Sequence, residues 1–276
     1  MAGMSELLYV YGFTPPGPLL VAMQVSHGGV DGSGPLGAIE HAGVAALASA
    51  VPASVFGAEA LQERLLDARW VVTQAERHNE VLQQALACGS VVPCRFATLF
   101  SGEAALRQAL EHCGAALTAA FARLDGRVEW AVRAFLDARP TPPPPSPPGG
   151  PSGDAGNAAR RGRTYLLGKV ADRQAQRSAA AQATVRAEAI VAAVADAADE
   201  VVALPVRALP GETPGKPFLN LACLVRRDRQ EAFSAAMTHQ AAAESAHGVA
   251  LTVTGPWPPF TFVSEAFSDH ADGAES

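Results

Sequence analysis

A proline-rich run near the middle of the chain constrains the fold more than any other feature. Eight of the twelve residues from Pro140 to Pro151 are proline. Proline fixes φ and lacks a backbone N–H, so this segment cannot join a helix interior or an inner strand. The run predicts a polyproline II spacer, followed by a flexible Gly/Ser stretch, between two domains. We therefore predict domains at 1–138 and 161–276 with a linker at 139–160.

The same run has an alternative function. Proline-rich segments in the polyproline II conformation bind SH3-like and WW-like domains, and a chain that used its linker in this way would be a generic adaptor protein. The run from Pro140 to Pro151 contains no basic residue that could orient such binding. A spacer is therefore the favoured interpretation.

Charge and hydropathy argue against several classes of partner. The formal net charge is −6 and the basic residues are dispersed, whereas a nucleic-acid partner requires clustered Lys and Arg. Apolar runs of membrane-spanning length are absent from the sequence, so a lipid membrane is not expected as a partner. The opening residues lack a signal-peptide pattern, and the four cysteines are too few for a secreted disulfide framework. These patterns predict a chain of the reducing cytoplasm.

Apolar patterning before the linker predicts a mixed helix and sheet domain. Strands are predicted at Leu7–Phe13, Leu19–Val25, Val44–Val51, Val91–Phe96 and Arg127–Leu136. A first helix is expected from about Glu59 to Cys88, and a second around Leu106–Leu124, with Ser101 as its N-cap. The first helix carries a predicted core stripe of Leu65, Ala68, Val72, Ala75, Leu82 and Leu86.

The residues after the linker predict a second α+β domain. A long Ala-rich helix, or a pair of helices, is expected from Arg163 to about Asp199, followed by a second helix near Arg229–Ser245. Strands are predicted at Val201–Leu209, Phe218–Arg226 and Val249–Thr254. With Tyr165–Gly168 as a first strand, the order approaches a ferredoxin-like βαββαβ layout.

Residue patterns that carry chemistry are missing from the sequence. The seven histidines are scattered without metal-ligand spacing, and neither a nucleophile elbow nor a phosphate-binding loop is present. His78 lies at the edge of a predicted apolar stripe and is interpreted as a partly buried structural histidine. We expect no catalytic residue, no metal and no cofactor. An enzyme with an unrecognised site between the domains is the alternative.

Arg95 and Glu129 form a separate hypothesis. Each is predicted on the polar side of an otherwise apolar strand, and neighbouring strands could bring the two together. A cross-strand ion pair that supports the fold is the first interpretation. A charge pair that faces a partner is the second.

Several segments together resemble the gas vesicle protein F/L family. Its initial strand resembles LLYVYGFTPP, and its long helix, with a Trp at the start and a His near the middle, resembles LLDARWVVTQAERHNEVLQQAL. VVPCRFATLF is similar to its Pro-x-Arg-Phe-Gly-Thr-x-Phe segment, and GRVEWAVRAF to its Glu-Trp strand. The signature residues are therefore Arg95, Phe96, Glu129 and Trp130, with Ala97 in place of the usual glycine. After the linker, GRTYLLGK, FLNLACLVRR and LTVTGPWPPFTFV complete a collinear set.

The resemblance implies a fold, a role and partners. It implies two α+β domains, the second a modified ferredoxin-like fold with a helical extension. It also implies an accessory or minor structural role in gas vesicle assembly, without known catalytic residues. The implied partners are the hydrophobic shell protein and other gas vesicle accessory proteins, and the implied location is the gas vesicle in the cytoplasm.

The segment Gly255–Phe260 is the first candidate for a binding surface. Its three prolines prevent regular strand pairing, while Trp257 and Phe260, on either side of Pro258, supply apolar anchors. A shell protein that is prone to β-sheet association needs a partner that shields its apolar surface. The alternative is that both aromatic side chains fill a seam between the domains.

Overall fold

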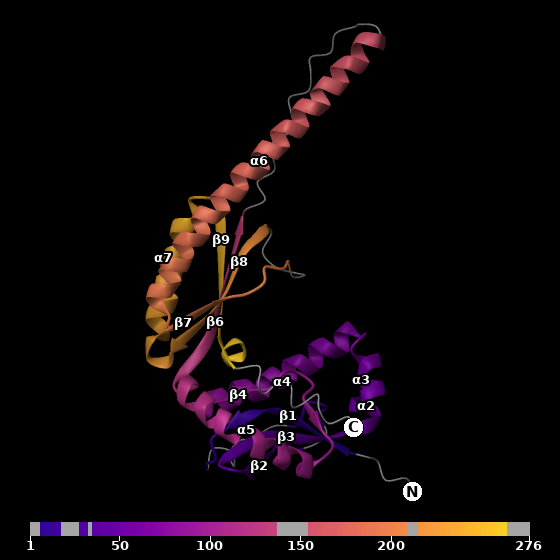
Figure 1. Cartoon of the computed structure of the whole chain (residues 1–276), viewed down its shortest axis with the longest axis vertical. Helices are drawn as coiled ribbons and strands as arrows, with labels where there is room; N and C mark the ends of the chain where they lie inside the picture. Colours follow the sequence, from indigo (N-terminus) through magenta and orange to yellow (C-terminus); the bar gives the residue numbers. More distant parts are fainter. Residues whose placement is uncertain (1–5, 18–27, 33–34, 137–153, 209–214, 264–276) are drawn as a thin grey trace. The chain divides into compact units, whose positions relative to one another are not determined.

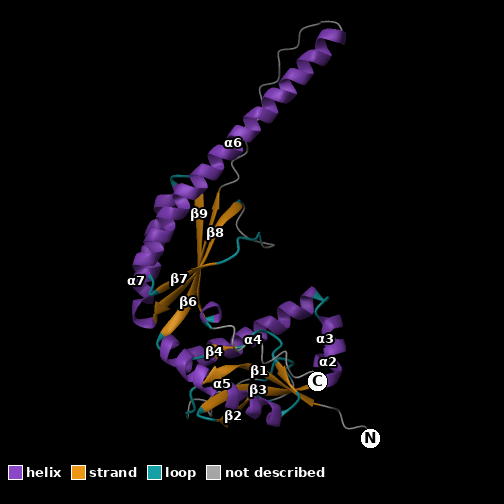
Figure 2. Cartoon of the chain, in the orientation of Figure 1, coloured by secondary structure: helices purple, strands orange, loops and turns teal. Residues whose placement is uncertain are grey.

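We describe the chain from a computed structural model, which defines residues 6–17, 28–32, 35–136, 154–208 and 215–263. The chain divides into two compact units (Figure 1). Unit 1 contains residues 1–130, 224–230 and 255–276, and unit 2 contains residues 131–223 and 231–254. Residues 224–230 and 255–276 thus belong to unit 1, whereas residues 161–276 were predicted to form the second domain. Both units combine helices with a sheet, as the predicted α+β class requires (Figure 2).

The sheet of unit 1 is built around β1 (Glu6–Thr14). β1 pairs antiparallel with β3 (Val44–Pro52), and β3 pairs with β2 (Gly37–His41). On its other side β1 pairs with two very short strands, β4 (Val92–Pro93) and β5 (Leu99–Phe100). The predicted strands at 7–13 and 44–51 are confirmed, whereas the predicted strand at 19–25 lies outside the described residues.

The predicted strand Val91–Phe96 is wrong in its extent. Pairing with β1 stops after Pro93 and resumes at Leu99, and a turn fills the gap. Hydrogen bonds still hold the turn to β1, because Cys94 N donates to Tyr11 O and Val10 N donates to Thr98 O. β4 and β5 are therefore two short segments of one edge strand that the turn at residues 94–98 interrupts.

Two long helices pack against this sheet. α4 (Ala68–Cys88) buries Leu82 and Leu86 against a cluster that includes alternate residues of β3, namely Ala45 and Leu47. α5 (Glu103–Leu124) contacts β1, β2 and β3, and its buried side chains lie outside that cluster. Since successive strand residues point to opposite faces, α4 and α5 cover opposite faces of the sheet.

The first predicted helix is divided in the structure. Two short helices, α2 (Ala53–Phe56) and α3 (Ala58–Arg64), precede a break before α4. α4 begins after Asp67, whose carboxylate caps it by accepting from the backbone N–H groups of Arg69 and Trp70. As a result, the N-terminal part of the predicted apolar stripe is exposed to solvent. Leu65 and Val72, predicted as core residues, are 47% and 55% exposed.

The second predicted helix and the strand after it agree well with the structure. α5 buries the expected row of side chains, and β6 (Arg127–Leu136) has the predicted bounds. The predicted N-cap is wrong, because Gly102 occupies that position and no side chain caps the helix. Gly126 has a φ of +62°, a conformation that glycine adopts without strain and that ends the helix before β6.

The second sheet contains β6, β7 (Glu200–Ala203), β8 (Lys216–Arg226) and β9 (Val249–Trp257), in the spatial order β7-β8-β6-β9. With α6 (Asp154–Ala197) and α7 (Gln230–Ser245), the chain order is βαββαβ. The first strand of this order is β6. Tyr165–Gly168, which the sequence analysis used as that strand, lies within α6, and so do residues 154–160 of the predicted linker.

α6 extends well beyond the core of its unit. Its 44 residues correspond to about 66 Å at 1.5 Å per residue. Near its C-terminal end, Ile190 and Val194 are fully buried, and Arg186 lies 3.9 Å from the carboxylate of Glu244 on α7. The N-terminal part continues past α7 (Figure 1). Among the described helices, none has both the length and the apolar character needed to cross a membrane.

The close approach of α4 to β1 gives a test of the packing. A Cβ atom added to Gly12 would lie 2.8 Å from the carbonyl oxygen of Val92 and 2.9 Å from a methyl group of Leu82. We expect Gly12→Ala to lower the free energy of unfolding by about 2 kcal/mol because the backbone must move to admit the methyl group. Gly89→Ala is the control, since an added Cβ there meets no atom within 4 Å. Equal urea midpoints for the two variants would contradict this packing.

Candidate functional site

The turn at residues 94–98, between β4 and β5, carries Arg95 and Phe96, and we call it the signature turn. Tyr9, on β1, binds this turn from the interior of unit 1. Its hydroxyl oxygen accepts the backbone N–H of Ala97 at 3.0 Å and lies 2.9 Å from Nδ1 of His78 on α4. The other ring nitrogen of His78, Nε2, lies 3.3 Å from the carbonyl oxygen of Cys94. Because a carbonyl only accepts, Nε2 carries the hydrogen and Nδ1 accepts from Tyr9. We call Tyr9, His78, Cys94 and Ala97 the tyrosine–histidine circuit.

Burial fixes the protonation of this circuit. Tyr9 is fully buried and His78 is 3% exposed. Burial raises the pKa of the Tyr9 hydroxyl and of the Cys94 thiol and lowers the pKa of His78 to about 4. All three groups are therefore neutral near pH 7. His78 was expected to be a partly buried structural histidine; it is more deeply buried than expected, and its two hydrogen bonds agree with a structural role.

A second tyrosine repeats the arrangement two residues further along β1. The hydroxyl of Tyr11 accepts the backbone N–H of Val30 and lies 2.8 Å from the hydroxyl of Ser49 on β3. Its ring stacks on His78 with centroids 5.6 Å apart. Tyr9 and Tyr11 thus place two hydroxyl groups on one face of an otherwise apolar strand. Neither tyrosine was predicted as a site residue from the sequence, although their spacing of two residues places both on one face of β1.

The structure separates the two members of the predicted Arg95–Glu129 ion pair. Arg95 is exposed, and only its backbone carbonyl takes part in the turn, where it accepts from the hydroxyl of Thr98 at 2.8 Å. Glu129 is 8% exposed and accepts two hydrogen bonds from Thr261, one from the backbone N–H and one from the hydroxyl, each at 2.8 Å. The pairing hypothesis is wrong because the partner of Glu129 comes from the C-terminal segment.

Phe96 and Trp130 support the packing of unit 1. Phe96 is partly buried, and its ring lies 6.2 Å from that of His78 and 6.4 Å from that of Trp70. Trp130 packs against the core cluster on the α4 face of the sheet. Gly255 lies so close above it that an added Cβ would be 2.9 Å from the indole ring. Glycine is required there, since its φ of +148° also disfavours other residues.

Residues 255–262, which we call the C-terminal strip, are attached to unit 1 at several points. Besides the bonds to Glu129, the Gln83 side chain donates to Pro256 O at 3.0 Å and Arg123 donates to Phe262 O at 3.3 Å. Pro258, Pro259 and Phe262 are buried. Trp257 and Phe260 are instead 37% and 40% exposed. A fixed backbone therefore presents two large aromatic side chains to solvent.

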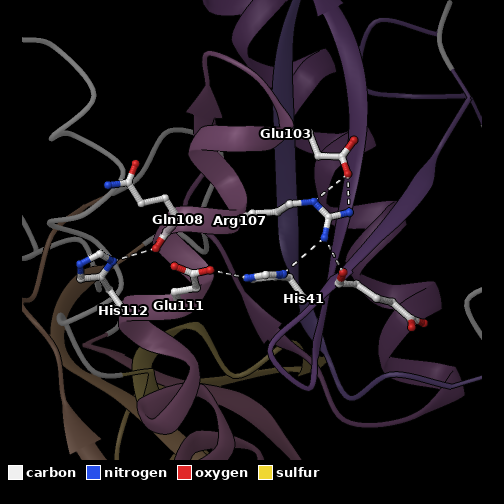
Figure 3. Close-up of polar contacts among 7 residues, drawn as sticks. His41, Glu103, Arg107, Gln108, Glu111 and His112 are labelled. Carbon is white, nitrogen blue, oxygen red and sulfur yellow. Dashed lines mark hydrogen bonds and ion pairs between the residues drawn. The ribbon is translucent and has the colours of Figure 1, made fainter.

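A further polar cluster joins the β2–β3 turn to α5 (Figure 3). Arg107 donates to Nδ1 of His41 at 3.3 Å, and Nε2 of His41 lies 3.0 Å from the carboxylate of Glu111. Arg107 also pairs with Glu103 one helical turn away and donates to Glu40 O. Because a guanidinium only donates, Nδ1 of His41 accepts from Arg107 and Nε2 donates to Glu111. These contacts fasten α5 to the edge strand of the sheet.

In the ranges that the structure describes, no three His, Cys, Asp or Glu residues converge in a way that could hold a metal ion.

Together, the fold and these contacts define an α+β protein with two sheets whose signature residues maintain a core and fix an exposed aromatic strip. The chain belongs to the gas vesicle synthesis protein GvpL/GvpF family, since the model of that family matches residues 7–264. Its role is therefore connected with gas vesicles.

Individual relatives agree with this membership. The chain is 28% identical to gas vesicle protein L of Streptomyces sp. (strain CB03234) over 96% of both chains. It is 29% identical to gas vesicle protein F of the same strain, over 67% of this chain and 75% of the relative.

Two crystal structures share the fold. Gas vesicle protein GvpF from Anabaena sp. PCC7120 superposes with a TM-score of 0.62 at 22% identity, covering 94% of this chain and 97% of that one. GvpF from Microcystis aeruginosa superposes with a TM-score of 0.64 at 17% identity, covering 94% and 99%.

The turn gives a prediction about Ala97. Its φ of +64° is left-handed, which costs an alanine about 1 kcal/mol relative to glycine. We expect Ala97→Gly to raise the free energy of unfolding by about 0.5–1 kcal/mol, measured by urea denaturation. Ala116→Gly, at an exposed position within α5, should instead lower it by about 1 kcal/mol. A loss of stability in both variants would show that Ala97 is not strained.

The tyrosine–histidine circuit predicts a pH dependence of stability. The pKa of His78 falls from 6.5 to about 4 on folding, so the unfolded chain binds the proton more tightly. Stability should be complete above pH 6.5 and decline by about 3 kcal/mol as pH falls to 4.

The control is His78→Gln, which removes the titrating group and should flatten this slope. Burial raises the pKa of Glu129 and acts in the opposite direction, so only the difference between parent and variant is diagnostic. Identical slopes for the two proteins between pH 4 and 6.5 would contradict a neutral buried His78.

Proposed function

We propose that this chain is an accessory protein of gas vesicle assembly that binds the hydrophobic shell subunit and acts at the gas vesicle. Family membership supports a role connected with gas vesicles. In this proposal the chain presents surface to other polypeptides, and those partners include further gas vesicle accessory proteins. It is not an enzyme.

The observation that carries the proposal is the exposed aromatic pair on the C-terminal strip. Trp257 and Phe260 lie outside the core although their neighbours Pro258 and Pro259 are buried. Large aromatic side chains lose little conformational entropy on binding and bury much apolar area, so they serve as anchors at interfaces. Because hydrogen bonds already fix the backbone of the strip, less conformational entropy is lost when it binds a partner.

The composition of the strip suits a partner with unpaired strands. Residues 255–257 form the end of β9, so regular pairing is lost only beyond Trp257, later than the sequence analysis predicted. Pro256, Pro258 and Pro259 still remove three backbone donors, so the strip cannot extend a sheet of the partner by continuous pairing. Binding would instead cover apolar side chains and leave the strand edges of the partner free for polymerisation. That behaviour matches an assembly factor, which must release its client.

The double variant Trp257→Ala/Phe260→Ala tests this function. Because both side chains are partly exposed, its melting temperature should stay within a few degrees of the parent value. Recovery of the shell subunit with the purified protein should fall by at least about tenfold, the loss expected for two anchor residues.

Leu65→Ala/Val72→Ala is the matched control, since it removes two large apolar side chains that are at least as exposed. That variant should retain the shell subunit. If the aromatic double variant instead melts far below the parent, the two rings are structural and the docking surface is wrong. Unchanged recovery of the shell subunit would also refute it.

A further inference from the structure

The C-terminal strip ends beside a group of arginine side chains. Arg123, in the last turn of α5, donates to Phe262 O at 3.3 Å. The exposed Phe260 is two residues before Phe262, so their Cα atoms are at most about 7 Å apart. Arg127 continues the group, because its Nη1 donates to Arg123 O at 2.8 Å. The backbone of one aromatic anchor therefore lies close to the first of these arginines.

The segment that follows β8 brings three more arginines to the same place. The backbone N–H of Arg227 donates to Gly126 O at 2.8 Å, directly beside Arg127. We call residues 123–127 and 226–229 the arginine corner, and this corner belongs to unit 1, as the strip does. It contains five arginines and two aspartates, namely Arg123, Arg127, Arg226, Arg227, Arg229, Asp125 and Asp228.

Folding gathers positive charge at this corner, although the basic residues are dispersed along the sequence. Five arginines and two aspartates give the corner a net charge of +3 in a chain of −6, so the remaining residues carry −9. All five arginines are exposed or partly exposed. The corner is therefore a positively charged surface on a negatively charged chain.

Two helix C-termini explain part of this arrangement. The Arg227 side chain donates to Leu86 O and Gly89 O at the end of α4, and Arg127 donates to two carbonyl oxygens at the end of α5. Each helix end carries about half a negative charge, so the two ends offset about one of the three positive charges. A guanidinium group has five N–H donors, and capping one or two carbonyls does not use them all. Helix capping therefore does not neutralise the corner.

A charged corner beside an exposed aromatic pair has the composition of a protein interface. Interfaces combine an apolar centre with a polar rim, and arginine is enriched in them. Arginine also binds a carboxylate through two parallel hydrogen bonds, which fix the orientation of the partner. The chemistry that this surface fits is therefore an apolar segment with a carboxylate at one end.

We propose that the arginine corner is the charged half of the shell-binding surface, where it binds an Asp or Glu side chain next to the apolar segment that Trp257 and Phe260 cover. This inference rests on the proposed function and adds the charge and the direction of the bound segment. The acidic end of that segment lies at the Phe262 end of the strip. Because the contact is electrostatic, salt weakens it.

A charge reversal in the full chain tests the inference. The variant is Arg226→Glu/Arg229→Glu, since the hydrogen bonds described above that hold the strip come from other side chains. At low salt, recovery of the shell subunit with the purified variant should fall at least about tenfold. Recovery with the parent should fall toward the same level near 0.5 M salt, where the screening length is only a few ångströms.

Two further variants separate the effect of charge from damage to the fold. Arg64→Glu/Arg69→Glu makes the same charge change at exposed positions on α3 and α4 and should retain the parent recovery. Asp228→Asn removes a negative charge at an exposed position of the corner and should raise recovery about twofold, a gain that a damaged fold would not give. The melting temperature of every variant should stay within a few degrees of the parent value.

The acidic residues near the end of the chain are a competing source of carboxylates. Residues 264–276 contain four of them, which Glu265→Gln/Asp269→Asn/Asp272→Asn/Glu275→Gln neutralises. In that background, Arg226→Glu/Arg229→Glu should still lower recovery at least about tenfold. A loss of this effect would assign the corner to carboxylates of the chain itself and overturn the inference.

Other outcomes distinguish this inference from the proposed function. If the aromatic double variant loses the shell subunit while the arginine variant retains it, the strip binds without the corner and only the inference fails. Recovery that does not change with salt would overturn the inference in the same way. If both variants retain the shell subunit, the proposed function fails as well. Tighter binding of a single-stranded oligonucleotide than of the shell subunit would assign the corner to nucleic acid.

Discussion

The hydroxyl group of Tyr9 connects three separate parts of unit 1. It belongs to the central strand, accepts the backbone N–H of Ala97 in the signature turn, and donates to His78 on α4. A buried hydroxyl without partners would cost several kcal/mol, so strand, turn and helix must assemble together. The interruption between β4 and β5 depends on this hydroxyl. In a regular strand the backbone N–H of Ala97 would donate to a neighbouring strand, whereas in the turn it points inward and donates to Tyr9. The position of the Arg95–Phe96 signature follows from the same contact.

Sequence patterns predicted the regular elements of this protein well. The alternation in Arg127–Leu136 and the four- and three-residue steps of Leu106–Leu124 identified β6 and α5, because each pattern extends over many residues with one period. The βαββαβ order was anticipated with the wrong first strand. Local patterning could not show that β6 continues into unit 2, and the ferredoxin-like assignment itself stays a prediction.

The contacts that the signature residues make could not be predicted from the sequence. Glu129 was assigned to Arg95 because both are charged residues on apolar strands, yet its hydrogen-bond donors come from Thr261, 132 residues away. Nothing in the local sequence encodes such a separation. Leu65 and Val72 were wrongly placed in the core because the apolar period was read across the break at Asp67. Ala97 is a different case. It stands in place of the usual glycine of the similar family segment, and its φ of +64° is a conformation that glycine adopts without strain.

For the proposed role beside β-rich shell subunits, the divided edge of the first sheet has a consequence. A strand that docks onto a sheet needs a continuous row of outward-facing amide and carbonyl groups, and long uninterrupted rows are sites of uncontrolled polymerisation. β4 and β5 offer only two residues each, and the turn between them points its peptide groups back toward β1. The sheet can therefore neither seed a fibre along this edge nor be drawn into a growing wall as an extra strand. A protein with the proposed role could therefore bind an assembling shell without joining it by backbone pairing at this edge.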